Sequence, residues 1–155
     1  MNQDTKTIDE YRVQWTKYTH HKGYYGSDEL FTDIIGPLLT PADIKDSNVA
    51  DIGSGNGHTV EMLLGAEPSK VLAIEPSNAF QVLEEKYKTN DRVQLLNVTG
   101  DKLPTNDRRL TIYDQLNPHH ARQEAIDLLK RNGFSDIKTH QRHGYSWSVL
   151  GTKSS

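Results

Sequence analysis

Three glycines at alternate positions, placed directly after a short apolar run, constrain the fold of this chain more than any other feature. The run at 48–52 predicts a buried strand. Gly53, Gly55 and Gly57 follow it, and glycine lets the main chain turn sharply and lets a ligand approach without meeting a Cβ atom. The residues at 57–65 are then expected to form a helix whose first amides point toward that ligand. The pattern therefore predicts a strand, a ligand-binding turn and a helix.

A second apolar run, at 70–75, ends in Glu75. In nucleotide-binding α/β folds, a carboxylate at that position accepts hydrogen bonds from ribose hydroxyls. A dinucleotide fold requires glycines in the pattern G-x-G-x-x-G, whereas this chain has G-x-G-x-G, with His58 where the third glycine would stand. A ligand with a nucleoside but no pyrophosphate fits this spacing better, so a nicotinamide dehydrogenase is disfavoured.

The segment at 51–57 resembles motif I of the class I S-adenosylmethionine-dependent methyltransferases. Glu75 matches the ribose-binding acid of that family. The segment at 97–104 is similar to its third motif, which places an aspartate near the adenine amino group. Three motifs in the same order and spacing are more specific than one glycine loop. The resemblance implies S-adenosylmethionine as the cofactor; the alternative is a Rossmann-like domain with another nucleotide or with none.

The resemblance also implies roles for individual residues. Asp51 would support the amino-acid portion of the cofactor, Glu75 would accept hydrogen bonds from the ribose, and Asp101 would accept one from the adenine amino group. The alternatives left open are that Asp51 only caps the loop, that Asp101 is a turn residue and that Glu75 is a solvated strand end. The cofactor site implied in this way consists of Asp51, Gly53, Ser54, Gly55, Gly57, Glu75, Pro76, Asp101 and Lys102.

The chain is expected to form one domain, 1–155, of the α/β class. The resemblance implies a Rossmann-like methyltransferase sheet, mostly parallel with an antiparallel C-terminal hairpin, flanked by helices and preceded by N-terminal helices. The first of these, at 7–20, carries an aromatic stripe and either docks on the core or covers the cofactor. The expected parts are an N-terminal helical lid (1–40), a cofactor-binding half (48–104) and a C-terminal helix and hairpin (110–155). The other expected elements are helices at 27–38, 57–65, 77–88 and 122–132 and strands at 48–52, 70–75, 92–97, 134–140 and 145–152.

The centre of the chain, after Pro104, is shorter than the resemblance implies. A complete member of the family continues with a fourth strand, a helix, a fifth strand and another helix, whereas here a polar stretch at 105–109 leads directly to 110–118. Either the printed sequence omits residues that the protein contains, or the domain is shortened. The first account is favoured, because the second would leave the strand at 48–52 with an exposed apolar edge, which promotes aggregation.

The charge balance bears on possible partners. The 155 residues include 18 Lys and Arg against 21 Asp and Glu, which gives a net charge of −3. This balance predicts no nucleic-acid partner, so a small-molecule methyl acceptor is expected. No apolar run approaches the ~20 residues of a membrane span, and the N-terminus lacks the apolar stretch of a signal peptide. A cytoplasmic protein is therefore expected. The chain has no cysteine, and its histidines lack the H-x-x-x-H spacing, so no metal site is expected.

These observations predict an enzyme that transfers the methyl group of S-adenosylmethionine to a small molecule. The sulfonium methyl group is already electrophilic, so the main task of such an enzyme is to position the acceptor. Catalytic residues therefore follow no fixed motif and are not assigned, and Asp114 or a nearby histidine is a candidate general base. The alternative function, favoured if the chain truly lacks its central strands, is a non-catalytic S-adenosylmethionine-binding or interaction protein.

Overall fold

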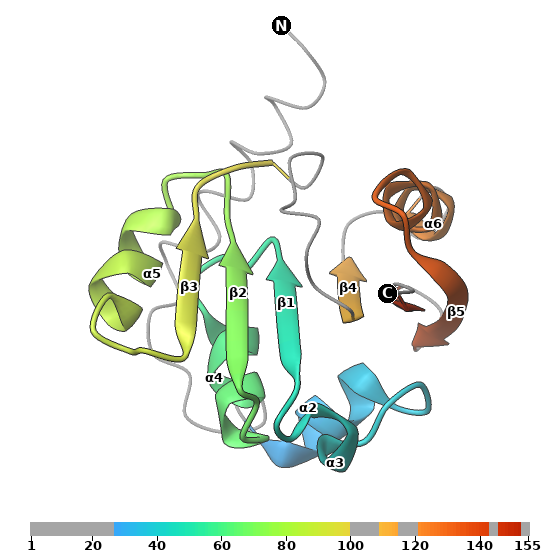
Figure 1. Cartoon of the computed structure of the whole chain (residues 1–155), viewed down its shortest axis with the longest axis horizontal. Helices are drawn as coiled ribbons and strands as arrows, with labels where there is room; N and C mark the ends of the chain where they lie inside the picture. Colours follow the sequence, from blue (N-terminus) through green and yellow to red (C-terminus); the bar gives the residue numbers. More distant parts are fainter. Residues whose placement is uncertain (1–26, 100–108, 115–120, 143–145, 153–155) are drawn as a thin grey trace, which may run out of the picture.

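The computed structural model of the protein describes residues 27–99, 109–114, 121–142 and 146–152. In this part of the chain two three-stranded sheets lie side by side, with helices on their faces (Figure 1). The first sheet is parallel, has the order β1-β2-β3, and pairs Ile52 with Ile74 and Ile74 with Leu96. The three strands therefore end together at one edge of the sheet. Their bounds are β1 Asn48–Ile52, β2 Lys70–Ile74 and β3 Val93–Leu96.

The second sheet is antiparallel and has the order β4-β6-β5. Its C-terminal pair confirms the expected hairpin, although β5 runs two residues further than predicted. The combination of a parallel sheet, an antiparallel hairpin and flanking helices is the predicted Rossmann-like α/β class. The bounds of the strands are β4 Arg109–Asp114, β5 Ser135–Arg142 and β6 Ser146–Thr152.

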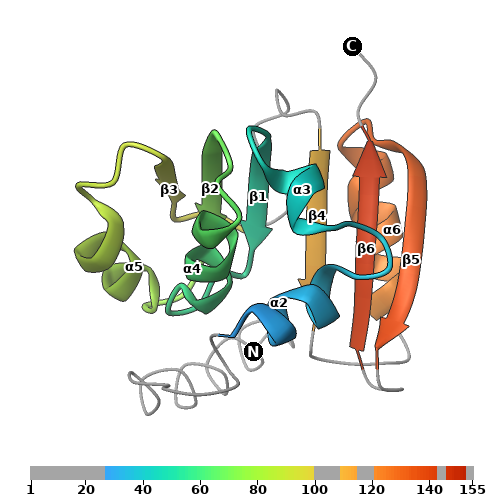
Figure 2. The ribbon, with the colours of Figure 1, turned by 90° about the horizontal axis from the view of Figure 1, so that it is seen from below.

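The strand β4 lies beside β1 and points in the same direction in both ribbon views (Figures 1 and 2). The two sheets are separate in the described chain, so no ladder of main-chain hydrogen bonds joins β1 to β4. Because β4 nevertheless packs along this side of β1, the expectation that a shortened centre would leave the edge of β1 exposed is wrong. The next strand of the chain takes up the place beside β1, so the physical objection to a truly shortened domain does not hold.

The helix α2, Asp28–Ile35, begins as predicted with Ser27 as its N-cap, whose hydroxyl accepts a hydrogen bond from the amide of Leu30 at 3.2 Å. A short helix that the sequence analysis did not predict follows, α3, Pro41–Ile44. Its N-terminus is a capping box in which Thr40 and Asp43 satisfy each other's main-chain amides. The remaining helices are α4 His58–Gly65, α5 Phe80–Tyr87 and α6 Ala121–Arg131.

The structure corrects one predicted helix boundary and confirms another. The helix expected at 77–88 begins three residues later, because Ser77 forms a turn, in which its hydroxyl accepts from the amide of Ala79, before the helix starts. The end of α6 is as predicted. Gly133 has φ +78°, and the amide of Phe134 bonds back to the carbonyl of Leu129 at 3.0 Å, which is the geometry of a glycine-terminated helix.

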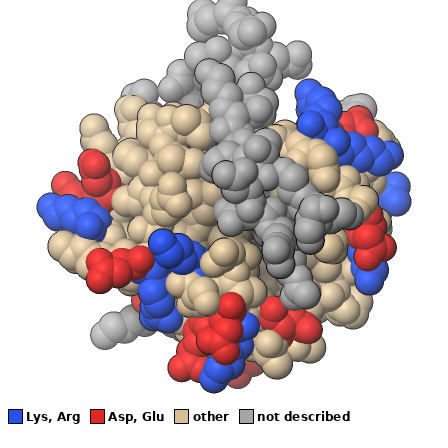
Figure 3. Space-filling model, viewed as in Figure 1, with Lys and Arg blue, Asp and Glu red and all other residues tan. Residues whose placement is uncertain are grey.

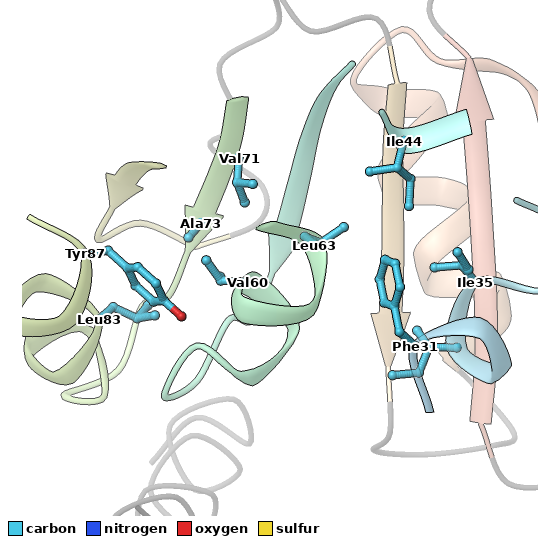
Figure 4. Packing of buried hydrophobic residues seen from close by; sticks show 10 residues of the cluster. Phe31, Ile35, Ile44, Val60, Leu63, Val71, Ala73, Leu83 and Tyr87 are labelled. Atoms are coloured by element: carbon cyan, nitrogen blue, oxygen red, sulfur yellow. The ribbon is translucent and has the colours of Figure 1, made fainter. Parts of the chain in front are cut away.

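The core has two layers, one on each face of the first sheet. Figure 4 shows side chains of one layer, which come from α2, α3, α4, α5 and β2, with Val60 and Leu83 fully buried. On the opposite face α6 covers the sheets, with Leu129 packed in the cluster that includes Ile74 and Val149. Of the predicted lid at 1–40, residues 1–26 lie outside the described residues. The segments 100–108 and 115–120, where the accounts of the short centre differ, lie outside them too.

Candidate functional site

The glycine loop at 53–57 is closed by hydrogen bonds within the fold. The amides of Gly53 and Ser54 both donate to the carbonyl oxygen of Ile74, at 2.8 and 3.0 Å, and the amide of Gly57 donates to the carbonyl oxygen of Ser54 at 2.8 Å. Gly53, Gly55 and Gly57 all have positive φ, between +53° and +88°, which only glycine adopts readily. The loop therefore fixes the ends of β1 and β2 against each other.

Glu75 connects this loop to the end of β2. One carboxylate oxygen accepts from the amide of Gly55 at 2.8 Å, and the other accepts from the amide of Ser77, also at 2.8 Å. The side chain is buried, with 6% of its surface exposed. Hydrogen bonds to a charged group are roughly twice as strong as neutral ones. Each carboxylate oxygen has two lone pairs, so a buried, oriented acceptor remains available beside the loop.

Asp51, the fourth residue of β1, is a buried carboxylate that the fold leaves half satisfied. Among the described residues its Oδ2 atom has no hydrogen-bond partner. The side chain lines a narrow, mostly apolar cavity between β1 and the helices α2, α3 and α4. Burial, with a smaller contribution from the negative charge of Glu75, raises the pKa of Asp51 to about 6 against the opposing effect of the Ser54 hydrogen bond. A cationic ligand group beside Asp51 would offset both the cost of burying its negative charge and its repulsion by Glu75.

Other predicted site residues differ in what they offer. The Ser54 hydroxyl donates to the carbonyl of Asp51 at 2.9 Å and accepts from the amide of Ile74 at 3.1 Å, so it closes the loop. Pro76 is exposed beside Glu75. Asp101 and Lys102 lie outside the described residues.

Two residues that the sequence analysis did not single out also hold the site. Tyr87, on α5, donates its hydroxyl proton to the carbonyl of Gly57 at 3.0 Å. A Cβ atom on Gly57 would come within 2.7 Å of the Tyr87 ring, so glycine is required there by packing as well as by conformation. Asn97, which follows β3, donates its side-chain amide to the carbonyl of Glu75 at 3.0 Å. No local sequence pattern predicts the contact of Tyr87 with the loop.

Solved structures with the same arrangement are methyltransferases. The magnesium protoporphyrin IX methyltransferase from Synechocystis, solved with the cofactor bound, matches 99% of this chain and 98% of its own, with a TM-score of 0.60 and 16% identity. An S-adenosylmethionine-dependent O-methyltransferase from Thermotoga maritima matches 96% of this chain and 71% of its own, with a TM-score of 0.57 and 15% identity. The chain has the class I methyltransferase fold. The resemblance predicted from the motifs is thereby confirmed.

Curated relatives agree with this fold. The tRNA U34 carboxymethyltransferase of Aliivibrio fischeri is 30% identical over 102 residues, which are 63% of this chain and 31% of the relative. The enzyme of the same name from Campylobacter jejuni is 28% identical over 123 residues, 70% of this chain and 41% of the relative. The chain thus spans between 31% and 41% of the length of these relatives. No protein-family model matches it.

The names of these relatives correct one prediction. They refer to a tRNA nucleotide, so the exclusion of nucleic acid and the expected small-molecule acceptor are wrong. The physical reason is that a net charge of −3 sums over the whole chain and says little about the potential at one site. The described part of the chain contains no helix long and apolar enough to cross a membrane. It also brings together no group of three side chains able to hold a metal ion.

Proposed function

We propose that this chain binds S-adenosylmethionine at the loop 53–57 and directs the methyl group of this cofactor to a nucleotide of a tRNA. The observation that carries the proposal is the position of Glu75, whose carboxylate is buried and fixed by two main-chain amides at the end of β2. A ribose that reaches this edge finds an oriented acceptor for its hydroxyls. The tRNA acceptor comes from the names of the curated relatives.

Two further features fit this cofactor. Asp51 Oδ2 is a buried carboxylate oxygen without a partner among the described residues, which suits the ammonium group of the amino-acid portion. A Cβ atom added to Gly53 would meet nothing within 4 Å, so a ligand has room to approach the main chain there. When bound, the sulfonium cofactor supplies an electrophilic carbon. The residues described here bind and orient it.

The same loop argues against a dinucleotide. The amides of Gly53, Ser54, Gly55 and Gly57 all donate to acceptors within the fold. A pyrophosphate is usually held by free amides at a glycine-rich turn and a helix N-terminus, and these four are already used. The structure of the loop thus supports the preference that the spacing G-x-G-x-G gave for a nucleoside without pyrophosphate.

The first test is calorimetric titration of the whole chain with S-adenosylhomocysteine and, separately, with NAD. We expect micromolar binding of the first, about −7 to −8 kcal/mol, and none of the second. Glu75→Ala should weaken binding at least tenfold, since a lost hydrogen bond to a charged group costs ~1.5–3 kcal/mol. Glu85→Ala, at an exposed position of α5, is the matched control and should bind as the unmodified chain does. An unchanged affinity in Glu75→Ala would remove Glu75 from the site.

The second test measures transfer. Label from S-adenosylmethionine should appear in an unmodified tRNA that has uridine at position 34 and not in the same tRNA with cytidine there.

A second candidate function is cofactor binding without catalysis. It is favoured by the short centre, in which β4 lies directly beside β1, and by the larger size of the curated relatives. Tight binding of S-adenosylhomocysteine with no transfer to any tRNA would support this candidate.

A further inference from the structure

An arginine and a tryptophan come together on the face of the second sheet that α6 covers. The guanidinium carbon of Arg122, in the first turn of α6, lies over the ring of Trp147 on β6, 5.3 Å from the ring centroid. The Nε atom of Arg122 also donates to the hydroxyl of Thr139 on β5 at 3.2 Å. One nitrogen and one face of the guanidinium group are therefore fixed by two different strands.

Arg122 is exposed to solvent, and no carboxylate among the side chains that the structure describes forms an ion pair with it. A guanidinium group has five N–H donors in a planar fork. With Nε bonded to Thr139, the two terminal nitrogens form no further hydrogen bond to the described residues and are an oriented pair of donors. Such a fork matches the oxygens of a phosphate group in a bidentate manner, and pre-orientation reduces the side-chain entropy lost on binding.

The strand register places this pair at the edge of the sheet where the cofactor residues lie. Trp147 is the partner of Asp114, the last residue of β4, in the antiparallel ladder. Because β4 lies beside β1 and points the same way (Figures 1 and 2), the end of β4 faces the same edge as the ends of β1 and β2. In open α/β sheets ligands bind outside the carboxyl ends of the parallel strands.

The charge around Arg122 is mixed. On α6, Glu124 and Asp127 lie between Arg122 and the pair Lys130 and Arg131, and all five side chains are exposed. Figure 3 shows blue and red atoms side by side over α6 rather than a continuous basic surface. This face therefore has no broad positive patch that would attract RNA. Binding of a polyanion here would depend on an individual, well-oriented contact.

We propose that Arg122, oriented by Trp147 and Thr139, binds a backbone phosphate of the tRNA acceptor in a single-stranded segment near the transferred group. The proposal rests on the function proposed above for its choice of acceptor. Recognition of RNA at loops commonly combines phosphate contacts with arginine and aromatic side chains.

The test is fluorescence anisotropy of a labelled 17-nucleotide anticodon stem–loop, with uridine at position 34, titrated with the full chain. Arg122→Ala should weaken binding about five- to tenfold and reduce the slope of log K against log salt by ~0.7–1, as loss of one phosphate contact does. Arg122→Lys keeps the charge but loses the fork, and should bind with intermediate affinity. Lys130→Ala removes the same charge from the other end of α6 and should change affinity less than twofold.

Three results would overturn the proposal: an equal loss in Lys130→Ala and Arg122→Ala, full affinity in Arg122→Lys, or no binding of the stem–loop by the unmodified chain. The first two would mean that only bulk charge matters. Titration of the same variants with S-adenosylhomocysteine separates this proposal from the proposed cofactor site, because Arg122→Ala should leave that affinity unchanged. If the unmodified chain bound the stem–loop through Arg122 but bound no S-adenosylhomocysteine, the cofactor proposal alone would fail.

Discussion

The hydroxyl of Tyr87 donates a hydrogen bond to the carbonyl oxygen of Gly57, across the boundary between α5 and the first turn of α4, at 3.0 Å. The same carbonyl accepts from the amide of Glu61 within α4, also at 3.0 Å. The Tyr87 ring fills the space where a side chain of residue 57 would be. Through this contact the helix after β2 holds the end of the glycine loop after β1.

Tyr87→Phe keeps the ring and removes the hydrogen bond. We expect it to lower the free energy of unfolding by about 1 kcal/mol, the usual net value of such a bond. Urea unfolding measures this loss. Lys45→Met, the control, breaks an exposed ion pair with Glu67 that does not involve Tyr87 and should cost less than ~0.5 kcal/mol. An equal or larger loss in Lys45→Met would contradict the role given to Tyr87.

Gly57→Ala should be far more destabilising than Gly53→Ala. Both positions have positive φ, +88° and +78°, so each alanine costs ~1–2 kcal/mol of main-chain strain. At Gly57 the new Cβ atom would also lie 2.7 Å from Tyr87 and 2.9 Å from Leu83, and overpacking adds ~1–3 kcal/mol. At Gly53 it would meet nothing within 4 Å. The comparison of the two variants by urea unfolding isolates the packing contribution, and similar losses would show that packing against α5 is unimportant.

Asp51→Asn should stabilise the fold increasingly as pH rises. The pKa of Asp51 is about 6 in the folded chain and ~3.9 when unfolded, so the folded state binds more protons between these values. Stability is therefore lost as pH rises from ~4 to ~6, by about 3 kcal/mol in total. The unfolding free energies of the two proteins, measured from pH 4 to pH 8, should diverge over that window in favour of Asn. A difference that is constant with pH, or that shrinks as pH rises, would be inconsistent with the burial of this carboxylate.

Ser148→Ala should loosen the attachment of α2 to the second sheet. Ser148, on β6, is almost fully buried and donates its hydroxyl proton to the carbonyl of Ile34 at 2.6 Å. Removing the donor leaves a buried carbonyl unsatisfied, so we expect a loss of ~1–3 kcal/mol in urea unfolding. Ser135→Ala, which removes an exposed hydroxyl that donates to Thr152 at 3.2 Å, is the control and should cost less than ~0.5 kcal/mol. Equal losses would contradict this account.

The parts of the fold that were predicted from the sequence depend on short stretches of chain. The glycine loop, the Ser27 N-cap and the Gly133 helix end each follow from a few adjacent residues. The short helix α3, which was not predicted, also has a local signal. The T-x-x-D sequence from Thr40 to Asp43 is a capping-box pattern that indicates α3.

The features that could not be predicted depend on residues far apart in the sequence. The position of β4 beside β1 requires knowing how two segments separated by more than fifty residues pack. The contact of Tyr87 with Gly57 joins two helices, and the pair of Arg122 and Trp147 joins a helix to the last strand. The acceptor was predicted wrongly for a related reason, since net charge carries no information on where charges lie.

The place where β1 and β4 meet has a mechanical consequence. Within the described chain, packing holds the two strands together but no ladder crosses between them, so a small shift of one sheet against the other would leave both ladders intact. Such a shift is opposed by the shared core, in which Ile74 and Val149 both pack with Leu129, and by the hydrogen bond from Ser148 to Ile34. The described cofactor residues Asp51 and Glu75 lie at the end of the first sheet and Arg122 packs on the second, so a shift would change the distance between them.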